Sequence, residues 1–382
     1  MTSKDETTSD APGRVGDNVL AFLRGRIEAG DYSDGEWLPT ERALAESLGV
    51  HRIHIRYALD RLEAEGLVER RPRCRPVVRL GRGPAVEAVK STSRDIALVM
   101  WHGDINDQSP SALQTTFWGA VRALGAAGYH PVILNLGDYP TTEAEDARRE
   151  EAHLRHILSR DIAGVLFYPY AYRSNHSLIR AVARKVPLVF LDRVISGVEA
   201  DFAGCTNFEG VYDATRHLIS MGHTRIAYVT TPEPINPVQD RLRGYLHALA
   251  DNDPPLTFEA VVTAPSRPDL AWSTLRPLFS LPAGERPTAI VCVNDHAAYY
   301  VAGEIEAMGL TIPADVSVIG FDDVRRTLPS GVGLSSVVQP FAEIGKAAAE
   351  LVIRRIEKPG APWLHREVPT TLAIRESVRA LS

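Results

Sequence analysis

From residue 95 onward, short apolar runs alternate with segments in which apolar residues recur at helical spacing. The runs are IALVM at 96–100, HPVILNL at 130–136, GVLFYP at 164–169, VPLVFLD at 186–192, RIAYVT at 225–230, AIVCVND at 289–295 and VSVIGFDD at 316–323. Strands of this kind that alternate with helices are typical of parallel sheets covered by helices on both faces. Because the runs fall on both sides of about residue 230, the sequence predicts two α/β halves.

The length and composition exclude several classes of protein. A chain of 382 residues is too long for one core of ordinary size, so we expect a small domain in addition to the two halves. The fractions of 45% hydrophobic and 24% charged residues exclude a disordered or collagen-like chain. No apolar run approaches the roughly 20 residues of a membrane helix.

The N-terminus and the cysteines indicate the compartment. The first residues, MTSKDETTSDAPGRVGD, are polar and contain no apolar signal segment, so we expect a cytoplasmic protein without a membrane partner. Cys74, Cys205 and Cys292 are scattered and lack CxxC spacing. They favour a reducing compartment and argue against a disulfide framework and a zinc site. We therefore expect neither a metal nor a cofactor.

Residues 15–80 have the pattern of a winged helix-turn-helix. The segment NVLAFLRGRIEAG predicts a first helix, and LPTERALAESLG predicts a second that begins after Thr40 and ends at Gly49. A third helix is expected from about His51 to Glu65. Two helices joined by so short a turn form a helix-turn-helix, whose second helix can enter the major groove of DNA. LVERR and PVV are candidate strands of a wing around RPRCRP.

The charge distribution supports a nucleic-acid surface in this region. The whole chain carries a net charge of −6, but residues 51–80 contain eight arginines against four acids. A local basic patch on an acidic protein suits binding to phosphates. Taken by charge alone, a solvated helix face explains the pattern equally well.

The order and spacing of these segments resemble the N-terminal domain of GntR-family transcription regulators. The residues that carry the resemblance are LPTERALAESLGV and R..IRYALDRLEAEGLVERR. It implies that Arg42, Arg52 and Arg56 contact DNA phosphates or guanine edges, and the planar fork of arginine suits both. Exposed helix arginines without such a role are the alternative.

Three departures from the GntR pattern fall on positions that face DNA. His51 replaces a small hydroxyl residue, and Ile53 and His54 replace small polar ones, so we expect an operator that differs from the common one of the family. The wing tip RPRCRP contains no glycine, which puts a tight turn there in doubt. Arg73 and Arg75 are expected to approach a narrow minor groove or to bind phosphates.

The chain changes character after residue 80. Residues 81–93, GRGPAVEAVKSTS, lose periodicity and predict a linker. We expect a disordered tail over 1–14, the DNA-binding domain over 15–80 and an effector-binding domain of two lobes over 94–380.

Polar residues follow three of the apolar runs. They are Asp192–Arg193, Asn294–Asp295 and Asp322–Asp323. Each pair alone is compatible with a helix cap or a surface turn. Because ligands of open α/β sheets lie beyond the carboxyl ends of the strands, three such pairs together predict a shared cleft.

The segments after residue 94 resemble the ligand-sensing domain of LacI/GalR-family regulators, which is related in fold to periplasmic sugar-binding proteins. The resemblance is carried by FWGAVRALGAAGYHPVI, VPLVFLDR, TNFEG, HLISMGHTRIAYV, DRLRGYLHAL, PTAIVCVNDHAA, GLTIPADVSVIGFDD, LSSVVQPFAEIGKAA and LAIRES. It implies a two-lobed, periplasmic-binding-protein-like domain with two parallel sheets. Joined to a GntR-type winged helix, this domain is similar to the arabinose-repressor architecture and implies a sugar effector.

The same resemblance implies which residues hold the effector. Arg241 and Asp322 fall on positions that bond ligand hydroxyls, and Asp295 is a similar candidate. Aromatic plates and further polar groups complete the expected set, which adds Ser109, Gln114, Phe117, Tyr168, Arg193, Trp272 and Asn294. A salt bridge between the halves is the alternative for the charged residues, and a place in the core is the alternative for the aromatic ones. Thr206–Asn207 stands where the family usually has Asp-Asn.

These expectations define a homodimeric repressor that binds a pseudo-palindromic operator and leaves it when a sugar binds between the lobes. The sequence contains no GxSxG, HExxH or phosphate loop, so we do not expect an enzyme. The alternatives are the same architecture with a nucleobase co-repressor, and a solute-binding protein for sugar uptake, which would require export.

Overall fold

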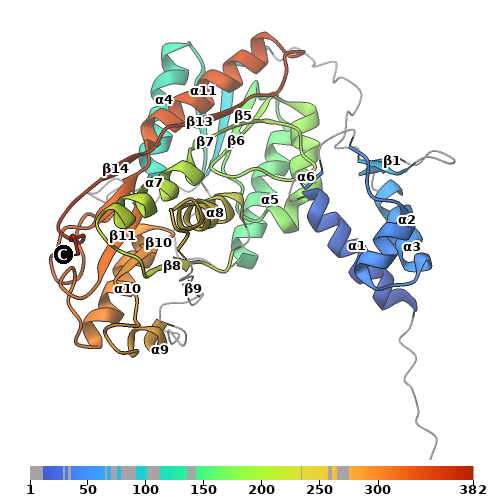
Figure 1. Ribbon diagram of the computed structural model, residues 1–382. Coiled ribbons are helices and arrows are strands. Elements are labelled where there is room, and N and C mark those ends of the chain that lie inside the picture. Colours follow the sequence, from blue (N-terminus) through green and yellow to red (C-terminus); the bar gives the residue numbers. More distant parts are fainter. Residues whose placement is uncertain are drawn as a thin grey trace, which may run out of the picture. The chain divides into compact units, whose positions relative to one another are not determined.

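A computed structural model describes residues 12–28, 31–32, 36–64, 67–69, 75–78, 92–100, 112–135, 143–233, 235–256, 260–264 and 275–381 (Figure 1). Contacts between Cα atoms divide the chain into two compact units. One unit consists of residues 1–90, 172–186 and 195–200, and the other of residues 91–171, 187–194 and 201–382. Most of the expected tail over 1–14 and of the expected linker over 81–93 lies outside the described residues.

The N-terminal region of the first unit is a winged helix-turn-helix. Its elements are α1 (Pro12–Glu28), α2 (Glu41–Leu48), α3 (Arg52–Ala64), β1 (Val68–Glu69) and β2 (Val77–Val78). The two strands pair antiparallel, with Val68 opposite Val78.

Local sequence signals explain where the second helix begins and ends. The Thr40 hydroxyl accepts a hydrogen bond from the Ala43 amide at 3.2 Å, which satisfies a donor of the first helical turn. Gly49 ends the helix with φ +63°, a left-handed conformation that glycine adopts without strain. Leu23, Ile55 and Leu59 are fully buried between the helices, as their spacing predicts.

The second unit contains two six-stranded sheets, and we call each sheet with its helices a lobe. The sheet of the first lobe is parallel, in the order β13-β7-β6-β5-β3-β4. Its strands are β3 (Asp95–Met100), β4 (His130–Asn135), β5 (Gly164–Phe167), β6 (Leu188–Leu191), β7 (Asp201–Cys205) and β13 (His365–Val368). Helices α4 (Ala112–Ala126), α5 (Glu143–Ser159) and α11 (Phe341–Glu357) belong to this lobe, and α6 (Tyr172–Lys185) joins β5 to β6 in the chain.

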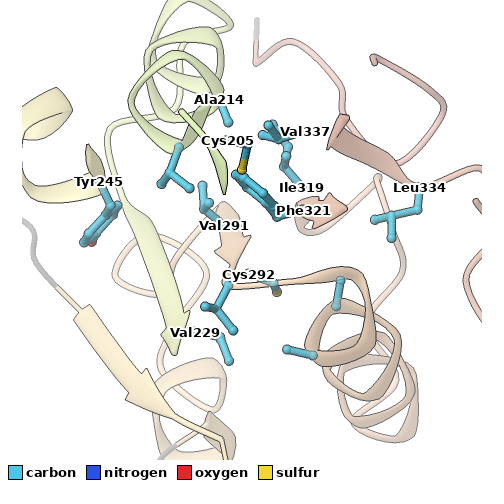
Figure 2. Packing of buried hydrophobic residues seen from close by; sticks show 14 of the residues in the cluster. Cys205, Ala214, Val229, Tyr245, Val291, Cys292, Ile319, Phe321, Leu334 and Val337 are labelled. Atoms are coloured by element: carbon cyan, nitrogen blue, oxygen red, sulfur yellow. The ribbon is translucent and has the colours of Figure 1, made fainter. Parts of the chain in front are cut away.

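The second lobe has the sheet order β14-β12-β11-β10-β8-β9, parallel except for the antiparallel edge strand β14. Its strands are β8 (Ile226–Thr230), β9 (Ala260–Thr263), β10 (Ala289–Cys292), β11 (Ser317–Asp322), β12 (Ser335–Val338) and β14 (Thr371–Ala373). Its helices are α7 (Asn207–Ser220), α8 (Asn236–Ala250), α9 (Leu275–Phe279) and α10 (Asp295–Ala307). Figure 2 shows Val229, Val291 and Ile319 on neighbouring strands in its core.

The chain passes between the lobes three times, which corrects the single division expected near residue 230. It crosses after β7, after β12 and between β13 and β14, and Figure 1 shows the last passage. Strand β8, which ends at Thr230, belongs to the second sheet, and β13 returns to the first. The strands β13 and β14 escaped the sequence analysis because HREV and TLA are short and half polar, unlike the apolar runs of the central strands.

Helices α4 and α11 approach each other closely at two glycines. A Cβ atom placed on Gly345 would lie 1.9 Å from the carbonyl oxygen of Thr116, and one on Gly119 would lie 2.1 Å from that of Ala342. The absence of a side chain at these positions therefore sets the distance between the two helices.

We expect Gly345→Ala to lower the free energy of unfolding by about 1–3 kcal/mol, because the added methyl group meets backbone that must shift. Gly303→Ala in α10 is the control, since no heavy atom lies within 4 Å of its added Cβ. That variant should be neutral or more stable by up to about 1 kcal/mol. Urea unfolding measures both changes, and equal stability of the two variants would contradict the packing described here.

Candidate effector cavity and DNA-facing surface

A cavity of about 380 Å³ lies at the carboxyl ends of strands from both lobes. This is the position at which open α/β sheets bind ligands. Its polar and aromatic lining residues are Thr116, Tyr168, Tyr170, Asp192, Arg193, Thr231, Glu233, Arg241, Asn294, Asp322, Gln339 and Phe341.

Arg241 of α8 forms the buried centre of this cavity. Its Nε donates to Asn207 Oδ1 at 2.8 Å, Nη1 donates to the Val293 carbonyl at 2.7 Å, and Nη2 donates to Gln339 Oε1 at 3.4 Å. The guanidinium carbon lies 3.6 Å from the centre of the Phe321 ring. Only 7% of the side chain is exposed, so the protein itself satisfies most of the donors of this cation.

Arg193 occupies the first-lobe side of the cavity. Its Nη2 donates to the Tyr168 hydroxyl at 2.7 Å, and the guanidinium carbon lies 4.8 Å from the centre of that ring. The Asp192 carboxylate is 3.3 Å from the same nitrogen. Asp192 has φ +68°, a conformation that costs energy for a residue with a side chain, and it lies in a tight turn in which the Arg193 amide donates to the Leu191 carbonyl at 2.8 Å.

Asp322 ends β11 and also has a positive φ, +108°. Burial raises the pKa of its carboxyl from 3.8 to about 8, although Arg241 opposes this rise. The charges of Asp295 and Asp192 add to it. Arg241 Nη2 is 3.8 Å from Asp322 Oδ1, beyond hydrogen-bonding distance, so the carboxyl retains capacity to accept a bond from a ligand.

The charges of the cavity favour a ligand that donates hydrogen bonds. Both guanidiniums are engaged by protein acceptors, whereas no ion pair involves Glu233 in the part of the chain that the structure describes. Asp322 and Glu233 therefore present acceptor oxygens to the cavity. Hydroxyl groups match such oxygens, and a ligand anion next to the Glu233 and Asp192 carboxylates would be repelled.

Hydrogen bonds link the lobes to each other and link the segments that pass between them. The Val194 amide of the first lobe donates to Asn236 Oδ1 of the second at 3.1 Å. At the passages between the lobes, the Thr370 amide donates to Thr206 Oγ1 at 2.9 Å, and the two threonine hydroxyls are 3.0 Å apart. Thr206 stands where the LacI/GalR family usually has an aspartate. Its bonds to Thr370 link the passage after β7 to the passage between β13 and β14.

The structure brings five of the predicted effector residues together. Those that line the cavity are Tyr168, Arg193, Arg241, Asn294 and Asp322. Gln114 and Phe117 are buried in α4 and do not line it. Ser109 and Trp272 lie outside the described residues.

Asp295 is buried behind the cavity instead of lining it. Its carboxylate accepts bonds from the Ser336 hydroxyl at 2.6 Å and from the Val324 and Arg325 amides at 2.8 and 3.1 Å. Burial raises its pKa to about 6. The residue holds the loop that follows Asp322, whereas its neighbour Asn294 both lines the cavity and caps α10 through a bond from the Ala297 amide.

Sequence reasoning missed several lining residues as site residues. They are Thr116, Tyr170, Asp192, Thr231, Glu233, Gln339 and Phe341. Asp192 stood in a recognised polar pair at a strand end, so its signal was present. Gln339 and Phe341 follow β12, whose sequence SSVV is too polar to resemble the central strands, and their place at a passage between lobes has no local signature.

Four of the predicted DNA-contacting side chains are exposed on or beside the helix-turn-helix. They are Arg42, His51, Arg52 and Arg56. Glu41 accepts from Arg56 Nε at 3.0 Å and lies 3.5 Å from Arg52, so one carboxylate orders both arginines at the start of α3. Arg42 pairs with Glu46 one turn along α2.

The other predicted DNA residues differ in their surroundings. His54 is half-buried. Arg75 Nε donates to the Leu38 carbonyl at 3.2 Å, which ties the wing to the segment before α2. Arg73 and the side chain of Ile53 lie outside the described residues.

Among the described residues, no group of three or more His, Cys, Asp or Glu side chains is arranged to hold a metal ion. No described helix is long and apolar enough to cross a membrane.

Comparison with known proteins identifies relatives of both regions. Residues 16–78 match the family model "Bacterial regulatory proteins, gntR family", and residues 215–378 match "Periplasmic binding protein-like domain". The ribose operon repressor of Haemophilus influenzae is 30% identical over 240 residues, which are 63% of this chain and 71% of that protein. The arabinose metabolism transcriptional repressor of Geobacillus stearothermophilus is 27% identical over 345 residues, covering 87% of this chain and 88% of that one.

Solved structures agree with this fold. A LacI family transcriptional regulator from Enterococcus faecium, crystallised with bound ribose, superposes with a TM-score of 0.59 at 22% identity. The superposition covers 75% of this chain and 100% of that one. The two-lobed architecture is thus shared over the whole length of that structure.

The raised pKa of Asp322 predicts a specific pH dependence of stability. Between pH 4 and 8 its carboxyl is protonated in the native state but ionised in the unfolded chain, so its stabilising contribution declines progressively over this range and is exhausted above about pH 8. Asp322→Asn keeps a neutral group at all pH values. The free energy of unfolding of this variant, relative to wild type, should therefore rise up to about pH 8 and then level off.

Urea unfolding at pH 5 to 9 measures this difference. Asp295→Asn is the comparison, because the pH-dependent part of its difference should end near pH 6. A difference between wild type and Asp322→Asn that does not change with pH would show that Asp322 titrates normally.

Proposed function

This chain belongs to the LacI/GalR family of ligand-responsive transcription repressors, and we propose that it is a repressor which a neutral sugar releases from DNA. The sugar would bind in the cavity between the lobes, and the GntR-type winged helix would bind the operator. We choose a neutral sugar as the ligand because of how the charged residues that line the cavity are paired. Asp322 and Glu233 face the cavity as acceptors, while Arg193 and Arg241 are engaged by the protein.

A sugar matches this set of groups in detail. Its vicinal hydroxyls donate to carboxylate oxygens, and its C–H face packs on aromatic rings such as Tyr168 and Phe341. The remaining N–H donors of Arg241 and the amide of Asn294 can reach ring or hydroxyl oxygens. A phosphorylated sugar or a uronic acid would bring an anion beside Glu233 and Asp192 without a free cation to receive it.

We propose that the DNA-binding residues are those that the GntR resemblance implies, namely Arg42, His51, Arg52, Ile53, His54, Arg56, Arg73 and Arg75. Helix α3 would lie in the major groove. Because Glu41 binds Arg52 and Arg56 in the free protein, both arginines are held at the start of α3, where recognition helices meet base edges. On binding DNA, the two arginines would give up their bonds to Glu41 and bond phosphate or guanine instead. Such a repressor acts on chromosomal DNA, so the proposed location is the cytoplasm.

The proposed repressor is a homodimer, since a pseudo-palindromic operator requires two winged helices. The edge strands of the two sheets support this state. Strand β4 exposes 55% of Ile133, and β9, the edge strand at the same position of the other sheet, exposes 41% of Val261. Edge strands with exposed apolar side chains are surfaces to which a second copy of the chain can pair.

The sugar would act by changing the arrangement of the lobes. Bonds across the cavity, from ligand to Arg193 in one lobe and to Asp322 in the other, would add to the Val194–Asn236 bond and favour the closed state. In a dimer, closure alters the distance between the winged helices. A coupling free energy of about 1–3 kcal/mol between ligand and operator is typical of such systems.

A thermal-shift screen with matched pairs of ligands tests the proposed ligand class. We expect one or more neutral sugars among L-arabinose, D-ribose, D-xylose and D-galactose to raise the melting temperature. Ribose 5-phosphate, galactose 1-phosphate and galacturonate should have little effect, and Asp322→Asn should weaken the response to the active sugar. An anionic member that stabilises more than its neutral parent would contradict the charge argument, and no response to any member would contradict sugar binding.

Arg52→Ala tests the DNA-binding surface. If Arg52 contacts a base, the variant should bind the operator less tightly by about 1–3 kcal/mol and discriminate less against other sequences. Arg61→Ala, at the other end of α3, is the control and should keep the sequence preference. Fluorescence anisotropy with duplexes from the upstream region of the gene measures both. Equal operator affinity of Arg52→Ala and wild type would remove Arg52 from the contact surface.

A further inference from the structure

Helix α6 differs in charge from the other described helices. Its sequence, YRSNHSLIRAVARK, contains Arg173, Arg180, Arg184 and Lys185 and no acidic residue. The chain as a whole carries a net charge of −6, so the four positive charges of α6 are opposite in sign to the net charge of the protein. Among the residues that the structure describes, no ion pair joins Arg173, Arg180 or Arg184 to a carboxylate.

The arginines of α6 form one stripe along the helix. Arg173, Arg180 and Arg184 are spaced by seven and four residues, so they lie on the same side over about three turns, or roughly 16 Å. Arg173 and Arg184 are exposed, and Arg180 is half-buried. The opposite side carries the buried residues Asn175, Ile179 and Val182. One face of α6 is therefore basic and largely exposed, and the opposite face is buried.

Both the linker and α6 lead into strands of the first lobe. Lys185 is three residues before β6, and the linker leads directly into β3. Strands β3, β5 and β6 are parallel neighbours, so their first residues lie at one edge of the sheet, about 10 Å apart from β3 to β6. The effector cavity is at the opposite edge. The chain therefore enters β3 from the linker and β6 from α6 at the same end of the sheet.

We infer, on the basis of the function proposed above, that α6 is a second DNA-contacting surface whose arginines bind phosphates beside the operator. Arginine suits this contact because its fork bonds phosphate oxygens, and phosphate contacts position a protein without selecting sequence. Residues 172–186 belong to the same compact unit as the winged helix, which is consistent with a joint surface. Removing the stripe would then weaken DNA binding without changing sequence preference.

A structural role is the competing explanation for part of the stripe. Cations in the last turn of a helix interact favourably with its dipole, and Arg184 and Lys185 are so placed. That role accounts neither for Arg173 in the first turn nor for Arg180. It predicts a change in melting temperature, whereas phosphate binding predicts a change in the salt dependence of DNA affinity.

The test measures binding of the full chain to a random-sequence duplex of about 40 bp, long enough for two half-sites and their flanks, over a range of salt concentrations. Each lost phosphate contact lowers the slope of log affinity against log salt by about 0.9. In the proposed homodimer, Arg180→Ser with Arg184→Ser removes four arginines per bound dimer and should therefore reduce the slope by about 3.6. Arg180→Lys with Arg184→Lys keeps the positive charges, so this variant should retain most of the wild-type slope.

A matched control removes two exposed arginines of the second lobe, through Arg243→Ser and Arg276→Ser. It changes the net charge by the same amount and should leave the slope close to that of wild type. If the double α6 variant does not fold, Arg184→Gln alone removes two arginines per bound dimer and should reduce the slope by about 1.8. Equal slopes for the α6 variants and the control would overturn the inference, whereas a wild-type chain that fails to bind duplex even at low salt would contradict the proposed function itself.

Discussion

The cavity and the passages between the lobes both depend on the buried guanidinium of Arg241. A buried cation is costly unless all of its donors are bonded, and here the partners come from different parts of the chain. Asn207 follows the first passage between lobes, Gln339 lies on the second, and the Val293 carbonyl ends β10. A movement of either passage would therefore break a bond to a desolvated charge. The same group lines the cavity, so a ligand at Arg241 acts directly on the segments about which the lobes would move.

The cavity also explains why two aspartates with the same sequence signal have different roles. Asp295 and Asp322 each stand at the end of an apolar strand, yet Asp322 faces the cavity and Asp295 is buried behind it. The difference arises from the helix that begins at Asp295, which turns its carboxylate toward the Val324 and Arg325 amides. Asp295 thus orders the loop that follows Asp322. A substitution there would alter the site without removing a ligand contact.

Much of the fold follows from local signals in the sequence. The Thr40 cap, the Gly49 stop and the spacing of Leu23, Ile55 and Leu59 define the winged helix, and the apolar runs locate the central strands of both sheets. The three passages between lobes could not be predicted from periodicity, because short edge strands such as β13 carry no apolar run. For the site, residues at the ends of recognised strands were identifiable, including Arg193 and Asp322. Gln339, Phe341 and Glu233 were not, since only the meeting of both lobes brings them to the cavity.

The central claim is that the cavity between the lobes and the operator are coupled, and calorimetry measures this most directly. The active sugar is titrated into the free protein and into the protein bound to operator DNA, and operator affinity is measured with and without the sugar. The account predicts that operator DNA lowers the affinity of the protein for the sugar by about 5- to 150-fold. The sugar should lower the affinity for operator DNA by the same factor. A sugar that binds the free protein and the DNA complex with equal affinity would contradict it.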